Sequence, residues 1–164
     1  EKVVRRGEPV LFDFTSVHGG YVIDMTRIAV VGALAPELER AFAVARAIQD
    51  ELAKGLHPGV PCTDLWEKAR AIAEQAGLGD RFMGPPGDQA RFVGHGVGLE
   101  LDELQVIAQG DKAPLREDQT IAVEPKGVFP GQGAGGIEKK GLVKEDGGEK
   151  RTEALGDDLL RGPA

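Results

Sequence analysis

The sequence has little cysteine, few aromatic residues and no long apolar run. The single cysteine, Cys62, cannot form an internal disulfide, which argues against a disulfide-stabilised secreted domain and favours a cytoplasmic location. No segment approaches the roughly 20 apolar residues that cross a bilayer, and none resembles a signal peptide, so we expect no membrane partner. With 20 basic against 27 acidic residues and a net charge of −7, the chain also lacks the positive surface expected of a nucleic-acid-binding protein.

The chain contains enough apolar residues to form one domain, and it has an excess of glycine. Of its 164 residues, 41% are apolar, which suffices to build a core at this length. The 24 glycines are about twice the number expected from an average content near 7%. They form no repeat, so collagen-like and low-complexity structures are excluded.

The first half of the sequence predicts a β-hairpin followed by two helices. Residues 10–16 and 21–31 are β-rich and flank the turn residues His18, Gly19 and Gly20. A helix is expected over residues 36–54, where six apolar residues recur at helical spacing: Leu38, Ala41, Phe42, Ala45, Ile48 and Leu52. A second helix is expected to begin after Thr63 as its N-cap and to end at Gly77, with Leu65, Ala69, Ile72 and Ala73 facing inward.

The second half predicts a loop followed by short strands. Residues 79–90 contain Gly84-Pro85-Pro86-Gly87 and are expected to form the loop. Short β-rich or glycine-rich pieces follow at residues 92–101, 105–108, 120–123 and 137–143. Strands, then helices, then strands indicate an α+β fold with a mainly antiparallel sheet.

Two aspartates interrupt the apolar strands of the predicted hairpin. Asp13 lies in Val10-Leu11-Phe12-Asp13-Phe14, and Asp24 lies eleven residues later on the other arm. Two carboxylates that meet across a hairpin repel each other unless a proton or a cation lies between them. Taken alone, Asp24 could instead pair with Arg27, and Asp13 could form a turn.

Three later residues have similar apolar or glycine-rich surroundings. His95 lies in Gly94-His95-Gly96-Val97-Gly98, where glycine allows close approach of backbone to one imidazole. Glu124 follows an apolar run, and Glu138 follows Gly135-Gly136-Ile137. Two aspartates, two glutamates and one histidine together indicate a site for a hard cation with oxygen ligands.

The segments VLFDF, GYVIDMTR, GHGVGLELDE, IAVEPKGVFPG and GIEKKGLVKEDG occur in this order. They resemble the five metal-ligand motifs of the methionine aminopeptidase and Xaa-Pro peptidase superfamily, with the match closest to the Xaa-Pro dipeptidase and aminopeptidase P branch. The resemblance runs from about residue 10 to the end and includes the eleven-residue spacing of the aspartates. It implies the pita-bread fold, in which helices cover a curved, mainly antiparallel sheet.

By this resemblance, two divalent ions are held by Asp13, Asp24, His95, Glu124 and Glu138. Asp13 would bind one ion, His95 and Glu124 the other, and Asp24 and Glu138 would bridge them. Glu124 and His95 would be catalytic, with Glu124 moving the proton, and the substrate would be a short peptide. Oxygen-rich ligation with one imidazole favours manganese, with cobalt, iron or zinc as alternatives.

The sequence departs from the superfamily pattern beside the ligands. Asp102 replaces the histidine usual seven residues after the ligand histidine, and Arg91 replaces one often found four residues before it. Gly136 replaces an arginine that commonly precedes the final glutamate, and Lys139 replaces the acidic residue after it. Arg91 and Asp102 are expected in the substrate-binding region. They could form an ion pair in place of two histidines, or Arg91 could bind a substrate carboxylate.

Other residues are expected to have supporting roles. Tyr21 and Arg27 belong to the motif around Asp24 and would support that ligand. His18 and His57 are expected to be structural or solvent-exposed, and Cys62 is not expected to be a nucleophile. Residues 144–148 are expected to form an exposed hairpin turn.

The sequence therefore predicts a dinuclear metallopeptidase that acts on the N-terminus of short peptides, with Xaa-Pro specificity left open. The alternatives are a non-catalytic pita-bread domain that binds peptides or proteins, and metal-independent chemistry of the creatinase kind. The first aspartate motif lies unusually early and the chain begins with Glu1, so we expect residues 1–164 to be the C-terminal part of a longer catalytic domain, with weak or no activity alone. Because such proteins are often dimers, a homodimer is compatible with the resemblance.

Overall fold

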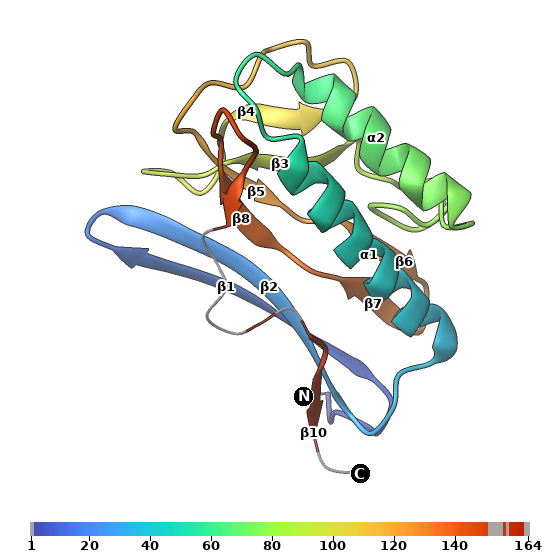
Figure 1. The fold of residues 1–164 in the computed structure, drawn as a ribbon. Helices are drawn as coiled ribbons and strands as arrows, with labels where there is room; N and C mark the ends of the chain where they lie inside the picture. The colour runs from blue at the N-terminus through green and yellow to red at the C-terminus, as the bar shows by residue number, and fades with distance from the viewer. Residues whose placement is uncertain (1, 151–155, 157, 163–164) are drawn as a thin grey trace.

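The computed structural model describes residues 2–150, 156 and 158–162. Figure 1 shows the two helices lying together over one face of the sheets, with a long hairpin projecting along the other side. In chain order the elements are β1 (Pro9–His18), β2 (Tyr21–Val31), α1 (Pro36–Lys54), α2 (Cys62–Gln75), β3 (Phe92–Gly96), β4 (Glu103–Ala108), β5 (Thr120–Val123), β6 (Lys126–Phe129), β7 (Gly133–Gly136), β8 (Lys139–Leu142), β9 (Glu149–Lys150) and β10 (Leu160–Gly162).

The first two strands form the predicted hairpin. Strands β1 and β2 pair antiparallel from Pro9 opposite Val30 to His18 opposite Tyr21. The turn between them consists of Gly19 and Gly20, with φ of 59° and 87°. Left-handed backbone at both positions matches the twist of the flanking strands and suits glycine, which explains why the hairpin closes there. Strand β10 adds to the other edge of β2 in parallel.

Both helices form where the sequence predicts them, with one correction at a terminus. Helix α1 begins at Pro36, ends before Gly55, and buries all six of the apolar residues expected to face inward. Helix α2 begins at Cys62 with Pro61 at the N-cap, so the prediction of Thr63 as N-cap is wrong. The Thr63 hydroxyl instead accepts a hydrogen bond from Gly110 N at 3.0 Å, which ties the helix start to a distant loop.

The later strands form an antiparallel sheet of order β4-β3-β5-β8-β9 and a separate β6-β7 pair. Strands at residues 92–101, 105–108, 120–123 and 137–143 were predicted, whereas β6 and β7 were not. Strand β7 reads Gly-Ala-Gly-Gly and has no side-chain pattern to indicate a strand. Its glycines are required by packing, because a Cβ on Gly135 would lie 2.5 Å from Leu38 O of α1. The chain reverses over residues 144–148 into β9, as expected for a hairpin turn.

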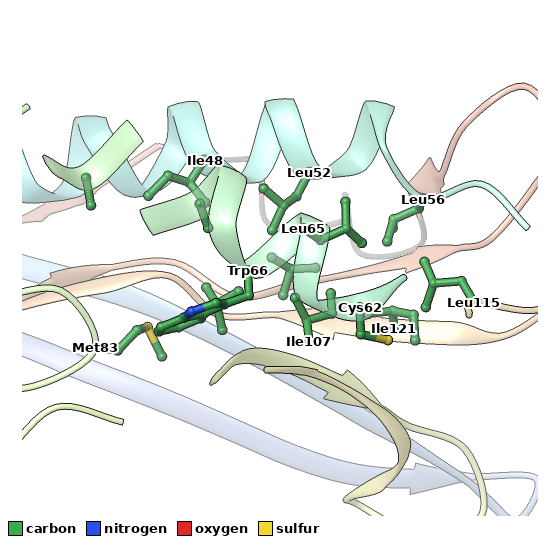
Figure 2. Close-up of a cluster of buried hydrophobic side chains, with 14 of the residues drawn as sticks. Ile48, Leu52, Leu56, Cys62, Leu65, Trp66, Met83, Ile107, Leu115 and Ile121 are labelled. Atoms are coloured by element: carbon green, nitrogen blue, oxygen red, sulfur yellow. The ribbon is translucent and has the colours of Figure 1, made fainter. Parts of the chain in front are cut away.

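The main core lies between the helices and the five-stranded sheet. Figure 2 shows Ile48 and Leu52 of α1 and Leu65 and Trp66 of α2 pointing toward Ile107 and Ile121 of the sheet. A smaller cluster joins Ile28 of β2 to the other face of α1 through Phe42 and Ala45. Helix α1 therefore packs against both the hairpin and the five-stranded sheet, and it sets the position of one relative to the other. Among the described residues, no helix has the length and apolar character needed to span a membrane.

Candidate metal centre

The hairpin places its two aspartates on the same face of the strands. Asp13 lies opposite Thr26 and Asp24 lies opposite Thr15, so the aspartates are diagonal neighbours across the pair. The two aspartates differ in burial: Asp24 is buried, whereas Asp13 is exposed. The Thr26 hydroxyl lies 3.3 Å from Asp13 Oδ1 and thus connects the exposed aspartate to the buried part of the site.

Histidine and both glutamates come from the later strands and face the hairpin. His95 lies on β3, Glu124 directly follows β5, and Glu138 lies between β7 and β8. His95 Nε2 is 3.8 Å from Asp24 Oδ2 and 4.0 Å from Glu124 Oε1. The Thr26 hydroxyl donates to Glu138 Oε2 at 2.8 Å. The structure therefore brings all five predicted residues, Asp13, Asp24, His95, Glu124 and Glu138, to the interface between the hairpin and the five-stranded sheet. This interface is called the seam below.

The backbone around His95 fixes which ring nitrogen faces this cluster. His95 Nδ1 donates to the carbonyl oxygen of Gly96 at 2.9 Å. Nε2 is therefore the ring nitrogen that is available to bind a cation. Gly94 lies so close to Ala122 O on β5 that any Cβ would collide with it. Glycine beside the histidine thus allows β3 and β5 to approach closely, as the sequence pattern indicates.

The carboxylates of the cluster repel one another in a buried setting. Burial, together with the nearby carboxylates of Asp24, Glu124 and Asp13, raises the pKa of Glu138 to about 8, despite the opposing hydrogen bond from Thr26. Burial and the charge of Asp13 also raise the pKa of Asp24. A cation among these groups would favour their ionised forms, so the electrostatics are those expected of a cation site.

The geometry of the buried donors fits a divalent ion. Asp24, His95 and Glu138 each offer one ligand atom, and these three atoms lie within 4.8 Å of one another. Carboxylate oxygens with one imidazole nitrogen suit a borderline or hard divalent cation. Glu124 and Asp13 lie next to these three residues, so their carboxylates are available as further ligands.

Arg27 and Tyr21 belong to the sequence motif around Asp24. The Arg27 side chain is fully buried, and Nη1 donates to Glu138 O at 2.8 Å and to Thr26 O at 2.9 Å. Arg27 therefore fixes the backbone at Glu138. Tyr21 is 63% exposed near the hairpin tip, three residues from Asp24 along β2. Alternation along β2 points both side chains to the face opposite Asp24, and the supporting role expected of them stays a prediction.

Two lysines beside the glutamates were missed by sequence reasoning. Lys126 Nζ forms an ion pair with Glu124 Oε2. Lys140 is buried, and its Nζ donates to Val22 O at 3.2 Å. Burial lowers the pKa of Lys140, and the opposing charges of Asp24 and Glu138 offset only part of this effect. The signal for both was their spacing, since each lysine lies two residues after a candidate ligand.

Asp102 and Arg91 do not form the ion pair hypothesised between them. Asp102 Oδ1 lies 3.4 Å from His95 Nδ1, with its side chain 78% exposed. Arg91 is exposed and lines a different pocket together with Trp66, Arg70 and Gln109. Strand β3 begins at Phe92, directly after Arg91, and separates Arg91 from the part of the chain that carries Asp102. Binding of substrate by Arg91 or Asp102 stays a prediction.

The remaining predicted residues lie outside the cluster. His57 Nδ1 donates to Glu145 O at 2.9 Å and thereby holds the turn after β8, as expected for a structural histidine. His18 is exposed at the hairpin tip. Cys62 is fully buried, and burial together with the charge of Asp111 raises the pKa of its thiol to about 11, which agrees with the expectation that it is no nucleophile.

A carboxylate-rich cluster with one histidine, set in a mainly antiparallel sheet covered by helices, is typical of a metal-dependent enzyme. The chain belongs to metallopeptidase family M24, which it matches over residues 1–145. The resemblance noted in the sequence motifs is thereby confirmed.

Individual relatives agree with this membership. The Xaa-Pro dipeptidase of Pyrococcus furiosus is 31% identical over 153 residues, which are 93% of this chain and 42% of that protein. The solved X-Pro aminopeptidase of Thermotoga maritima superposes with a TM-score of 0.88 at 28% identity, covering 98% of this chain and 44% of that one. A methionine aminopeptidase of Rickettsia prowazekii, at 20% identity and a TM-score of 0.69 over 89% of this chain, shares the fold.

The fold is thus the pita-bread fold, as predicted. The chain spans about 42% of the length of the Pyrococcus furiosus relative. That it is the C-terminal part of a longer catalytic domain stays a prediction.

Proposed function

We propose that this protein is a metal-dependent peptidase that binds two divalent ions and removes the first residue of short peptides, with Xaa-Pro dipeptides as the expected substrates. The observation that carries the proposal is the cluster of Asp24, His95 and Glu138, whose ligand atoms lie within 4.8 Å of one another. Membership of family M24 and similarity to proteins named Xaa-Pro dipeptidase support the reaction and the substrate class.

In this proposal the five cluster residues share two ions. Asp13 would hold one ion, His95 and Glu124 would hold the other, and Asp24 and Glu138 would contribute to both. When bound, the ions would activate a water molecule and polarise the scissile carbonyl. We expect manganese, with cobalt, iron and zinc as alternatives.

The residues of the chain itself would supply orientation and proton transfer. Glu124 lies at the rim of the cluster, only partly buried, with Oε1 4.0 Å from His95 Nε2. A carboxylate at this position can accept a proton from water and pass it to the leaving amine. The Gly96 carbonyl holds His95 in the tautomer that presents Nε2. Arg27 holds the backbone of Glu138 in place.

The test combines metal content with hydrolysis. Protein loaded with manganese should contain close to two ions per chain and release alanine from Ala-Pro or Ala-Ala, and chelation should abolish the reaction. Glu124→Gln should lower kcat more than about 100-fold, a typical loss for a proton-transfer group. The exposed Glu117→Gln provides a matched control and should retain activity.

Two results would contradict the proposal. If the metal-loaded full-length protein cleaves neither dipeptide, the peptidase assignment fails. If no metal binds under manganese-replete conditions, a non-catalytic peptide-binding domain becomes the better account.

A further inference from the structure

Lys126 is paired with the glutamate that lies next to the buried part of the cluster. Lys126 Nζ donates to Glu124 Oε2 in an ion pair, while the other oxygen, Oε1, lies 4.0 Å from His95 Nε2. The side chain of Glu124 is only 15% exposed, so its carboxylate has lost most of its contact with water. A carboxylate in such surroundings is stable only beside a positive charge, and Lys126 supplies a full one.

The backbone around Lys126 gives this side chain a defined place. Lys126 is the first residue of β6, and its carbonyl oxygen accepts a hydrogen bond from Met83 N at 2.9 Å. Gly136 of β7 lies directly opposite, and a Cβ there would be 2.6 Å from Lys126 Cβ. The strand pair therefore has room for the lysine only because position 136 is glycine. The arginine that the superfamily pattern has at this position would collide with it, so the two departures from the pattern are linked.

The two partners of the ion pair differ in how easily they can part. The Lys126 side chain is 37% exposed, more than twice the exposed fraction of Glu124. A lysine carries its charge on a flexible four-carbon stem and can turn its ammonium group into water. The largely buried carboxylate has no such alternative. If another cation binds to Glu124, Lys126 is therefore the partner that moves away.

Glu124 also differs in position from the three most tightly grouped residues of the cluster. Asp24, His95 and Glu138 each offer a ligand atom, and these atoms lie within 4.8 Å of one another. A cation held by these three residues would leave the ion pair of Lys126 intact. A cation held by Glu124 would share one carboxylate with an ammonium group, and the two positive charges would repel each other.

We propose that Lys126 is an internal counter-cation of Glu124, and that a divalent ion binds to this glutamate only in competition with Lys126. This inference rests on the proposed two-ion peptidase and adds a control of metal loading to it. Lys126 lowers the affinity for the ion that Glu124 holds, which is therefore the weaker of the two, and has little effect on the other. Removing the lysine should strengthen metal binding, whereas removing a residue with a purely structural role should weaken it.

The test is a calorimetric titration of manganese into the full-length protein after treatment with chelator. Lys126→Met should tighten binding of the weaker ion at least about tenfold and change that of the tighter ion less than about threefold, because the competing charge is gone. Lys126→Arg keeps the charge and should resemble wild type. The matched control is Lys144→Met, since Lys144 forms an ion pair with Asp118 and is 33% exposed, and it should change neither affinity.

A double-mutant cycle assigns the effect to Glu124. In the Glu124→Gln background there is no carboxylate for Lys126 to neutralise, so adding Lys126→Met should change manganese affinity less than about twofold. Equal tightening in both backgrounds would overturn the inference. Unchanged or weaker manganese binding in Lys126→Met, or tightening in Lys126→Arg as large as in Lys126→Met, would overturn it as well.

These titrations do not depend on turnover, so they separate the inference from the peptidase assignment. Tighter manganese binding in Lys126→Met supports the inference even if Ala-Pro is not cleaved, and in that case only the peptidase assignment fails. Cleavage of Ala-Pro by a protein whose manganese affinity does not respond to Lys126→Met overturns the inference alone. Absence of manganese binding in wild type and in both Lys126 variants would overturn both.

Discussion

At the scale of single residues, the candidate centre is defined by charges that the fold forces together. Asp24 and Glu138 are buried beside each other, and Glu138 responds with a pKa raised to about 8. The hydroxyl of Thr26 donates to Glu138 Oε2, and the guanidinium of Arg27 donates to the backbone oxygen atoms of Thr26 and Glu138. Neutralisation of the cluster is therefore left to protons, to the nearby lysines, or to a bound cation.

Glu138 predicts how the stability of the metal-free protein depends on pH. Because its pKa rises from 4.5 to about 8 on folding, the folded state holds a proton that the unfolded state releases between these values. This contribution to stability is complete below about pH 4.5 and is lost as the pH rises through 8. Urea unfolding with chelator present should show wild type losing at least about 1 kcal/mol more than Glu138→Gln between pH 5 and 8.5.

The exposed Glu117→Gln serves as the control and should follow wild type. If Glu138→Gln and wild type have parallel pH profiles, the carboxyl of Glu138 titrates normally and the electrostatic description of the cluster is wrong.

At the scale of secondary structure, helix α1 positions the backbone directly before each of the two glutamates. Gln49 is buried on α1, and its amide Nε2 donates to Val123 O and, at 3.4 Å, to Ile137 O. These carbonyls belong to the residues directly before Glu124 and Glu138. One amide therefore sets the relative position of two candidate ligands, although the helical pattern alone gave no reason to expect a buried polar residue there.

Replacing Gln49 should lower both the free energy of unfolding and the affinity for manganese. Gln49→Leu leaves two buried carbonyls without this donor, which costs about 1–3 kcal/mol of unfolding free energy. Calorimetric titration with manganese should also show at least tenfold weaker binding, a loss typical of residues that orient ligands. Gln75→Leu, at the exposed end of α2, should change neither quantity. Unaltered manganese affinity in a folded Gln49→Leu variant would exclude a positioning role.

At the scale of the whole molecule, the candidate centre joins two separate sheets. Contacts between Asp24 and His95, Thr26 and Glu138, and Val22 and Gly98 connect the hairpin to the five-stranded sheet. Several carboxylates meet at this seam, and their repulsion opposes the contact. The hairpin also exposes apolar side chains along its length, including Phe12, Phe14 and Tyr21, so much of its surface adds nothing to this attachment.

Metal binding should therefore stabilise the molecule as a whole. At a free metal concentration 100 times the dissociation constant, one bound ion adds about 2.7 kcal/mol to the unfolding free energy. Thermal or urea unfolding with manganese and with chelator should show this difference at pH 7.5. The gain should be lost in Asp24→Asn, and identical unfolding of wild type under both conditions would contradict a metal centre at the seam.

The sequence by itself determined the local structure and the residue types of the candidate centre. Turn residues between two β-rich runs indicated the hairpin, and helical spacing indicated both helices, because these features depend on neighbours a few residues away. The five candidate ligands were also evident from their unusual surroundings and motif order, although their roles stay predictions. The glycine-rich strand β7 was not evident, since its structure depends on close packing against α1.

Only the tertiary structure decided which groups actually meet. It buried Asp24 and exposed Asp13, turned Arg27 to Glu138 O, and separated Arg91 from Asp102. It also brought Gln49 and Lys140 to the seam, far along the chain from the residues they contact. Such contacts depend on how helices and sheets pack, and residue spacing along the chain carries no information on which distant surfaces come together.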